Sequence, residues 1–158
     1  MYPNNRKLAI RVISIAIAAA FSGSVLAQQV IEEVVVTAQK RVQKLQDVPI
    51  SITAISGREL EDKKIDGFGS LDGIAPNVTL RSAPAAPLTA AVYIRGVGTG
   101  QPAMWTDPSV GLYVDGVFVG KNQGAMFDLL DLDRVEVLRG PQGTLFGRNT
   151  EGGAINFV

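Results

Sequence analysis

The segment VEVLRGPQGTLFGRNTEGGAINFV, residues 135–158, carries the clearest fold signal in the sequence. Its two apolar runs, residues 135–138 and 154–158, are rich in β-branched side chains and predict strands. The connection contains three glycines within residues 140–147 and ends in a predicted helical turn. It lacks the Gly-Lys-Ser/Thr ending of a phosphate-binding loop. We therefore expect two strands joined by turns, without a nucleotide site.

The preceding sequence alternates short strands with short helices. Ser56 and Glu59 have the spacing of a capping box, which starts a helix. Asp115-Gly116 is typical of the tight turn of a hairpin. An α+β fold is therefore expected, with a small mixed β-sheet, short helices and long Gly/Pro-rich loops. The expected elements are strands at 48–53, 78–80 and 91–95, a hairpin at 110–119, helices at 57–64, 70–75 and 127–131, and loops at 81–87 and 101–108.

Composition excludes several classes of chemistry. The 158 residues contain no His and no Cys, and 15 Lys and Arg balance 15 Asp and Glu. A Ser-His-Asp or Cys-His nucleophile and a His/Cys zinc site are therefore absent. The zero net charge is unlike that of a protein that binds nucleic acid in bulk. We expect no enzyme activity, no cofactor, no metal site and no nucleic-acid partner.

The N-terminus has the layout of a secretory signal peptide. Basic side chains between residues 6 and 11 precede the apolar run 12–21, and small residues lead to Ala27. The alternative is a membrane anchor, but the run is about half of the roughly 20 apolar residues that cross a bilayer. Residues 1–27 are therefore expected to be a signal peptide, cleaved after Ala27.

Two further features need partners that the sequence does not supply. A β-branched block near residue 35 lies ahead of the domain, followed by the polar stretch 39–46, and has no obvious strand partner in its own chain. Arg95 and Arg139 each end an apolar strand and precede a glycine. They are either two surface arginines or buried guanidiniums, which require carboxylates from elsewhere.

Four strings occur in an order that resembles the N-terminal part of a TonB-dependent outer-membrane receptor. They are EEVVVTA at 32–38, YIRGVG at 93–98, GLYVDGV at 111–117, and the segment 135–158. The resemblance implies a TonB box and linker at residues 28–46 and a plug domain, with the plug-domain fold, at 47–158. It also implies a 22-stranded barrel around the plug, the TonB protein as partner through strand addition, and energy-coupled uptake of a scarce ligand such as a ferric siderophore.

The same resemblance assigns three sets of site residues. Arg95 and Arg139 correspond to plug arginines that pair with carboxylates of the barrel wall. Loops at 81–89, 98–108 and 117–122 correspond to the outward-facing apices of the plug. The ligand contacts implied there are Arg81, Gln101 and Trp105. The implied TonB-binding residues are Glu32, Glu33, Val34, Val35, Val36, Thr37 and Ala38.

The barrel of such a receptor needs about 220 residues, at roughly 10 per spanning strand. None follow Val158 in this sequence. Two alternatives stay open: a fragment of a longer receptor, located in the outer membrane, or a truncated product in the periplasm. In the second case the chain is a barrel-less TonB-binding module without transport activity.

Overall fold

The computed structural model describes residues 34–84, 86–126, 128–129 and 131–158. The expected signal peptide, Glu32 and Glu33 lie outside the described residues. Among the residues that are described, no helix is long and apolar enough to cross a membrane.

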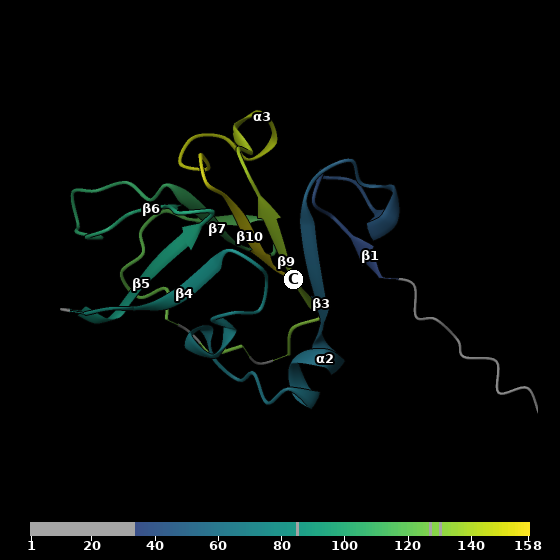
Figure 1. Ribbon diagram of the computed structural model, residues 1–158, viewed down its shortest axis with the longest axis horizontal. Coiled ribbons are helices and arrows are strands. Elements are labelled where there is room, and N and C mark those ends of the chain that lie inside the picture. Colours follow the sequence, from purple (N-terminus) through teal and green to yellow (C-terminus); the bar gives the residue numbers. More distant parts are fainter. Residues whose placement is uncertain (1–33, 85, 127, 130) are drawn as a thin grey trace, which may run out of the picture. The chain divides into compact units, whose positions relative to one another are not determined.

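A five-stranded mixed sheet forms the centre of the described structure (Figure 1). Its strand order is β3-β9-β10-β7-β8, and β10 pairs in parallel with β7 and antiparallel with β9. The strands predicted at 135–138 and 154–158 are confirmed as β9 and β10. Asp115 and Gly116 join β7 to β8 with positive φ angles of 49° and 78°, as the hairpin prediction requires. The strands are β3 (Ile52–Ser56), β7 (Val110–Val114), β8 (Val117–Val119), β9 (Arg134–Arg139) and β10 (Gly153–Phe157).

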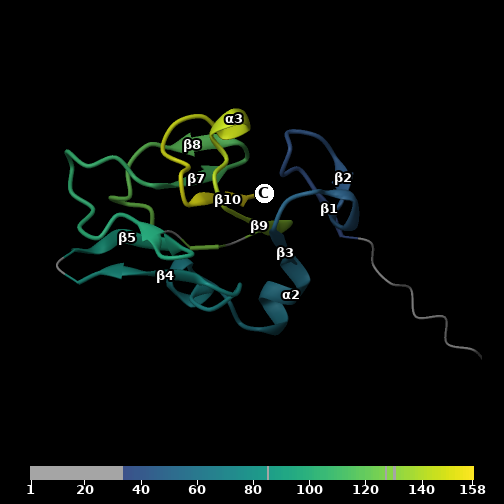
Figure 2. The same cartoon turned by 45° about the horizontal axis from the view of Figure 1, so that its top comes forward.

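A three-stranded sheet, β4 (Val78–Ala83), β5 (Ala86–Ile94) and β6 (Val97–Gly98), packs on the first (Figure 2). The prediction of a loop at 81–87 is wrong, because β4 and β5 form a hairpin through this stretch. Pro84 lies in its turn and Pro87 near the start of β5, where a missing N–H removes little of the ladder.

The helices are short. In α2 (Gly57–Asp62) the amide of Glu59 donates to Ser56 Oγ at 3.3 Å, which confirms the predicted helix start. The helix predicted at 127–131 is wrong: Asp128 forms an isolated bridge with Gly67, and the neighbouring amide of Leu129 donates to a backbone carbonyl rather than to a helical turn. The other elements are η1 (Leu45–Asp47), η2 (Phe68–Leu71), α3 (Gly143–Phe146), β1 (Val35–Val36) and β2 (Gln43–Lys44).

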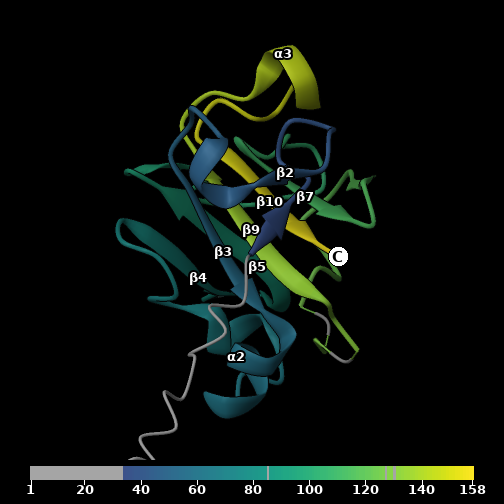
Figure 3. The ribbon, with the colours of Figure 1, turned by 90° about the vertical axis from the view of Figure 1, so that its right-hand side faces the viewer.

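Side chains alternate along each strand, so the five-stranded sheet has two distinct faces. The core face packs against η2 and the second sheet, and its buried side chains are Ile55, Val110, Leu112, Val135, Val137, Ile155 and Phe157. The cover face lies under residues 34–50, and its side chains include Ile52, Ala54, Tyr113, Phe118, Arg134, Glu136, Leu138, Ala154 and Asn156. Figure 3 shows β1 and β2 in front of this face, with β4 and β5 behind the sheet.

Candidate functional site

The block around residue 35 is a strand that pairs within its own chain. In β1, Val35 pairs with Lys44 and Val36 with Gln43, antiparallel to β2. The expectation that this block has no partner in its own chain is therefore wrong. The physical reason is a tight turn: the amide of Lys40 donates to the Thr37 carbonyl at 2.8 Å, which reverses the chain. The polar stretch that follows then returns as the second strand.

The apolar side chains of this segment are divided between the sheet and solvent. Val36 and Ala38 are completely buried and pack with Leu138 and Ala154 on the cover face. The side chain of Val35 is 39% exposed. Alternation along the strand accounts for this division, because only every second side chain faces the sheet.

A buried carboxylate lies under the same segment. Glu136 is completely buried on the cover face, and its Oε1 accepts from the Thr37 amide at 2.7 Å and the Thr37 hydroxyl at 3.2 Å. Arg134 Nε donates to the same oxygen at 2.7 Å, and Nη2 of Arg134 donates to the Thr37 hydroxyl at 3.3 Å. Arg134 also pairs with Asp133 at the surface. Sequence reasoning missed both Glu136 and Arg134; the signal was one acidic side chain inside the apolar run VEVL.

The turn between β1 and β2 makes a second contact with the cover face. Lys40 Nζ lies 5.9 Å from the ring centroid of Tyr113 and 5.1 Å from that of Phe146. The Tyr113 hydroxyl donates to the Phe146 carbonyl at 2.6 Å, and burial raises the pKa of Tyr113 above 10.0. A cavity of about 360 Å³ lies beside this turn, with Arg41 and Asp115 in its lining.

The two arginines predicted to face a barrel lie at the other end of the sheet. Arg95 is exposed, and its Nη1 would lie 3.5 Å from a Cβ at Gly140, which places the guanidinium near the backbone next to Arg139. Arg139 Nη1 donates to the Pro76 carbonyl at 3.4 Å, and its buried Nε has no hydrogen-bond partner among the described residues. No carboxylate within the described part of the chain pairs with either arginine.

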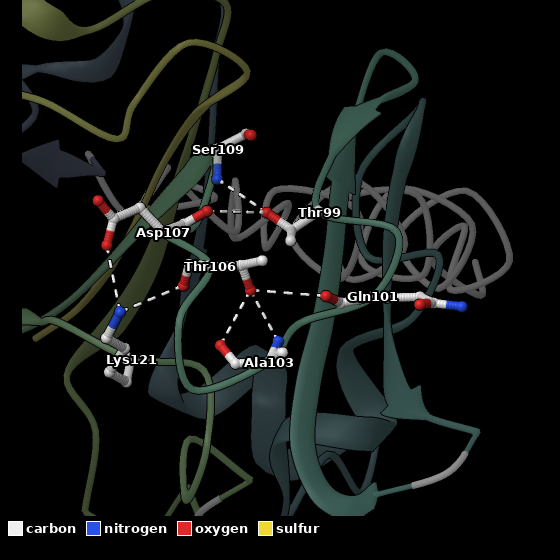
Figure 4. A network of polar contacts seen from close by, with 7 residues as sticks. All are labelled: Thr99, Gln101, Ala103, Thr106, Asp107, Ser109 and Lys121. Carbon is white, nitrogen blue, oxygen red and sulfur yellow. Dashed lines mark hydrogen bonds and ion pairs between the residues drawn. The ribbon is translucent and has the colours of Figure 1, made fainter.

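Hydrogen bonds brace the long loop that follows β6 (Figure 4). Its ends meet where the Ser109 amide donates to Thr99 Oγ1 at 3.1 Å. Thr106 Oγ1 accepts from the Ala103 amide at 2.7 Å. Lys121 Nζ donates to the Thr106 carbonyl and to an Asp107 carboxylate oxygen, each at 3.2 Å, and so connects the loop to the segment after β8. These hydrogen bonds connect the two ends and the middle of a loop that contains little regular structure.

The three predicted ligand contacts are exposed on and beside this loop. The Arg81 guanidinium lies 6.0 Å from the ring centroid of Tyr93, whose hydroxyl donates to the Thr99 carbonyl at 3.4 Å. The amide of Gln101 points away from the hydrogen-bond network in Figure 4. Trp105 is 86% exposed. Arg81 therefore contacts the loop through Tyr93, while Gln101 and Trp105 belong to it.

Comparisons with known proteins agree with this geometry. The family model described as "TonB-dependent Receptor Plug Domain" matches residues 44–154. The pesticin receptor of Yersinia pestis is 34% identical over 140 residues, which cover 88% of this chain and 20% of the receptor. The iron-regulated outer membrane virulence protein of Vibrio cholerae is 31% identical over 159 residues, which cover 92% of this chain and 23% of that protein.

Solved structures give the same result. The crystal structure of the ferric yersiniabactin uptake receptor FyuA from Yersinia pestis matches with a TM-score of 0.60 and 35% identity, over 69% of this chain and 17% of FyuA. The ferripyoverdine receptor of Pseudomonas aeruginosa matches with a TM-score of 0.62 at 21% identity, over 78% of this chain and 16% of the receptor, and supports the fold alone. The chain spans about a fifth of the length of the curated relatives.

Proposed function

The chain belongs to the plug domains of TonB-dependent receptors, and on that premise we propose that it gates an outer-membrane receptor for energy-coupled uptake of a scarce ligand, such as a ferric siderophore. The names of its relatives describe receptors and transporters, among them a ferric yersiniabactin uptake receptor. In this proposal residues 1–27 direct export, residues 28–46 contain the TonB box and linker, and residues 47–158 are the plug.

The observation that carries the proposal is the short ladder between β1 and β2. This ladder consists of two residue pairs, Val35 with Lys44 and Val36 with Gln43. A strand supplied by TonB would form a longer ladder, and main-chain hydrogen bonds would supply the affinity. We therefore assign TonB binding to Glu32, Glu33, Val34, Val35, Val36, Thr37 and Ala38.

Arg95 and Arg139 are assigned to contact with the barrel. Both guanidiniums lie at the same end of the sheet, and Arg139 Nε is buried without a partner among the described residues. A buried guanidinium nitrogen without an acceptor is costly, and a carboxylate from the inner barrel wall would satisfy it.

Ligand contact is assigned to Arg81, Gln101 and Trp105. An exposed indole provides a large apolar surface, while a guanidinium and an amide provide hydrogen bonds to an anionic, oxygen-rich ligand. The bracing of the loop by Lys121 and Thr106 supports this assignment, because a fixed loop loses less conformational entropy on binding.

The test of the TonB assignment is Val35→Pro in the receptor that carries this chain. Proline removes one amide from the strand and fixes its φ angle, so we expect TonB binding and ligand uptake to be lost. The side chain of Val35 is partly exposed, which limits the effect on the fold. The matched control is Val35→Thr, which keeps both the amide and the β-branched shape and should retain uptake. Uptake that is unchanged by Val35→Pro would contradict the proposal.

A further inference from the structure

The two edges of β1 have different neighbours. The amide of Leu45 donates to the Val34 carbonyl at 3.0 Å, so the polar groups of Val34 face β2. Backbone groups of successive strand residues point to opposite edges. Those of Val36 therefore face β2 as well, whereas the amides of Val35 and Thr37 face away from it. This outer edge is the one on which another strand can add.

At Thr37, the outer edge of β1 is occupied by the side chain of Glu136. The Thr37 amide donates to Glu136 Oε1 at 2.7 Å, the length of a charge-assisted hydrogen bond. Glu136 comes from β9, an interior strand of the five-stranded sheet, and is completely buried. An added strand needs the Thr37 amide for its own ladder, and so competes with this carboxylate.

Arg134 determines what happens to Glu136 when that contact breaks. Its Nε donates to the same Oε1 at 2.7 Å, and 13% of the Arg134 side chain is exposed. If Thr37 moves away, Glu136 keeps its ion pair with Arg134. No unpaired charge is then left in the sheet. An unpaired Glu136 carboxylate would make the separation of Thr37 from the sheet strongly unfavourable.

We propose that Thr37, Arg134 and Glu136 form a latch that holds the TonB-binding strand on the cover face and blocks strand addition until Thr37 is released. The inference rests on the proposed function, because it regulates the same segment. Receptor molecules with a closed latch do not pair with TonB at Thr37, so the affinity for TonB is reduced by the fraction that is closed.

The experiment compares TonB affinity and backbone protection in variants of the receptor that carries this chain. The double variant Arg134→Met with Glu136→Leu replaces both charges with apolar groups of similar size, so no buried charge is left unpaired. We expect the periplasmic domain of TonB to bind about tenfold more tightly, the factor that one hydrogen bond to a charged group represents. Without TonB, hydrogen exchange across residues 34–44 should be faster by a similar factor.

Two single variants keep the test valid if the double variant does not fold. Thr37→Val removes the hydroxyl contacts with Glu136 and Arg134 but keeps the amide bond, so about a threefold effect in the same direction is expected. The control Glu59→Gln removes an exposed carboxylate that pairs with Lys63 on α2, and should change neither measurement.

The outcomes separate the latch from the proposed function. Unchanged TonB affinity and unchanged exchange in folded latch variants would overturn the latch, even where Val35→Pro abolishes binding. If Val35→Pro leaves TonB binding intact, the proposed function fails, and the latch as a regulator of TonB pairing fails with it. Tighter binding together with faster exchange, both absent in Glu59→Gln, would support the latch.

Discussion

The core face and the cover face belong to the same five strands but are covered in different ways. On the core face the covering elements are a second sheet and η2, and the rings of Phe68 and Phe157 lie 6.0 Å apart. On the cover face a short segment near the N-terminus buries Val36 and Ala38 over a row that includes Glu136 and Asn156. The core face is apolar at its centre, whereas the cover face mixes apolar packing with buried polar side chains.

This difference indicates which cover can be removed. Glu136 Oε2 and Asn156 Oδ1 are buried without a hydrogen-bond partner among the described residues. Each unsatisfied atom of this kind costs about 1–3 kcal/mol, so the cover face is less well stabilised than an apolar interface of equal area. We expect release of the segment to expose both oxygens to water. The buried side chains at the centre of the core face are apolar, so separation there exposes apolar surface without such compensation.

The largest expected effect is on the core face, from Phe157→Ala. This side chain is completely buried against Phe68, so its truncation should lower the free energy of unfolding by about 3–5 kcal/mol. Chemical denaturation measures the change. The matched control is Phe118→Ala on the cover face, where the ring is only half-buried and the loss should be less than half as large. Equal losses of unfolding free energy in the two variants would contradict the stronger packing of the core face.

Gly153→Ala tests how closely β9 and the second sheet approach the backbone of β10. A Cβ on Gly153 would lie 2.2 Å from the Leu138 carbonyl oxygen and 2.9 Å from Ile94 Cδ1 on β5, at a φ of +147°. We expect a loss of about 3 kcal/mol, because both strain and overlap contribute. Gly116→Ala is the matched control, with φ +78° and open space around its Cβ, and should cost about 1 kcal/mol. Similar thermal shifts for the two variants would contradict the close approach.

Val36→Ala tests the cover. The side chain is completely buried, and loss of two methyl groups should cost about 1.5 kcal/mol. We expect most of this cost to appear as faster hydrogen exchange across residues 34–44, with little change in the midpoint of global unfolding. Hydrogen exchange and thermal denaturation of the same sample distinguish local opening of the segment from global unfolding. A fall in the global midpoint without faster local exchange would show that the segment unfolds only with the whole domain.

The smallest expected effect concerns Tyr113 on the cover face and depends on pH. Tyr113→Phe removes the hydrogen bond to the Phe146 carbonyl and should cost about 1 kcal/mol at neutral pH. Because burial raises the pKa of Tyr113, the folded protein keeps this proton where the unfolded chain loses it. The resulting stabilisation is complete below pH 10.0 and is lost as pH rises through the raised pKa. Unfolding midpoints measured against pH should therefore fall less steeply above pH 10.0 in Tyr113→Phe than in the unchanged protein. Identical slopes of the unfolding midpoint against pH in the two proteins would contradict the raised pKa of Tyr113.

Local patterns predicted the elements whose signals lie within a few residues. The start of α2 at Ser56, the turn at Asp115-Gly116 and strands β9 and β10 are all confirmed. The hairpin through residues 81–87 was missed, because its prolines are typical of a loop, whereas pairing along β4 and β5 outweighs that local preference. The helix predicted at 127–131 failed for a related reason, since Asp128 bridges to distant Gly67.

The candidate site followed from the sequence only in part. The glycine after each arginine singled out Arg95 and Arg139, and the family resemblance implied the three ligand contacts; both assignments stay predictions. The partner of Thr37 could not be predicted, because Glu136 is 99 residues away along the chain. An acidic side chain within an apolar strand indicates that some polar partner exists, but a local pattern does not identify it.

By itself the sequence determined the excluded chemistry, the order of the plug-domain strings and the alternation that gives the sheet two faces. Those properties depend on residue types and on spacings of a few residues. Only the tertiary structure decided that β10 pairs in parallel with β7, that Arg95 lies against the backbone beside Arg139, and that a carboxylate of β9 binds the Thr37 amide. These contacts join residues far apart in the chain, and they form because folding brings unsatisfied polar groups and apolar faces together.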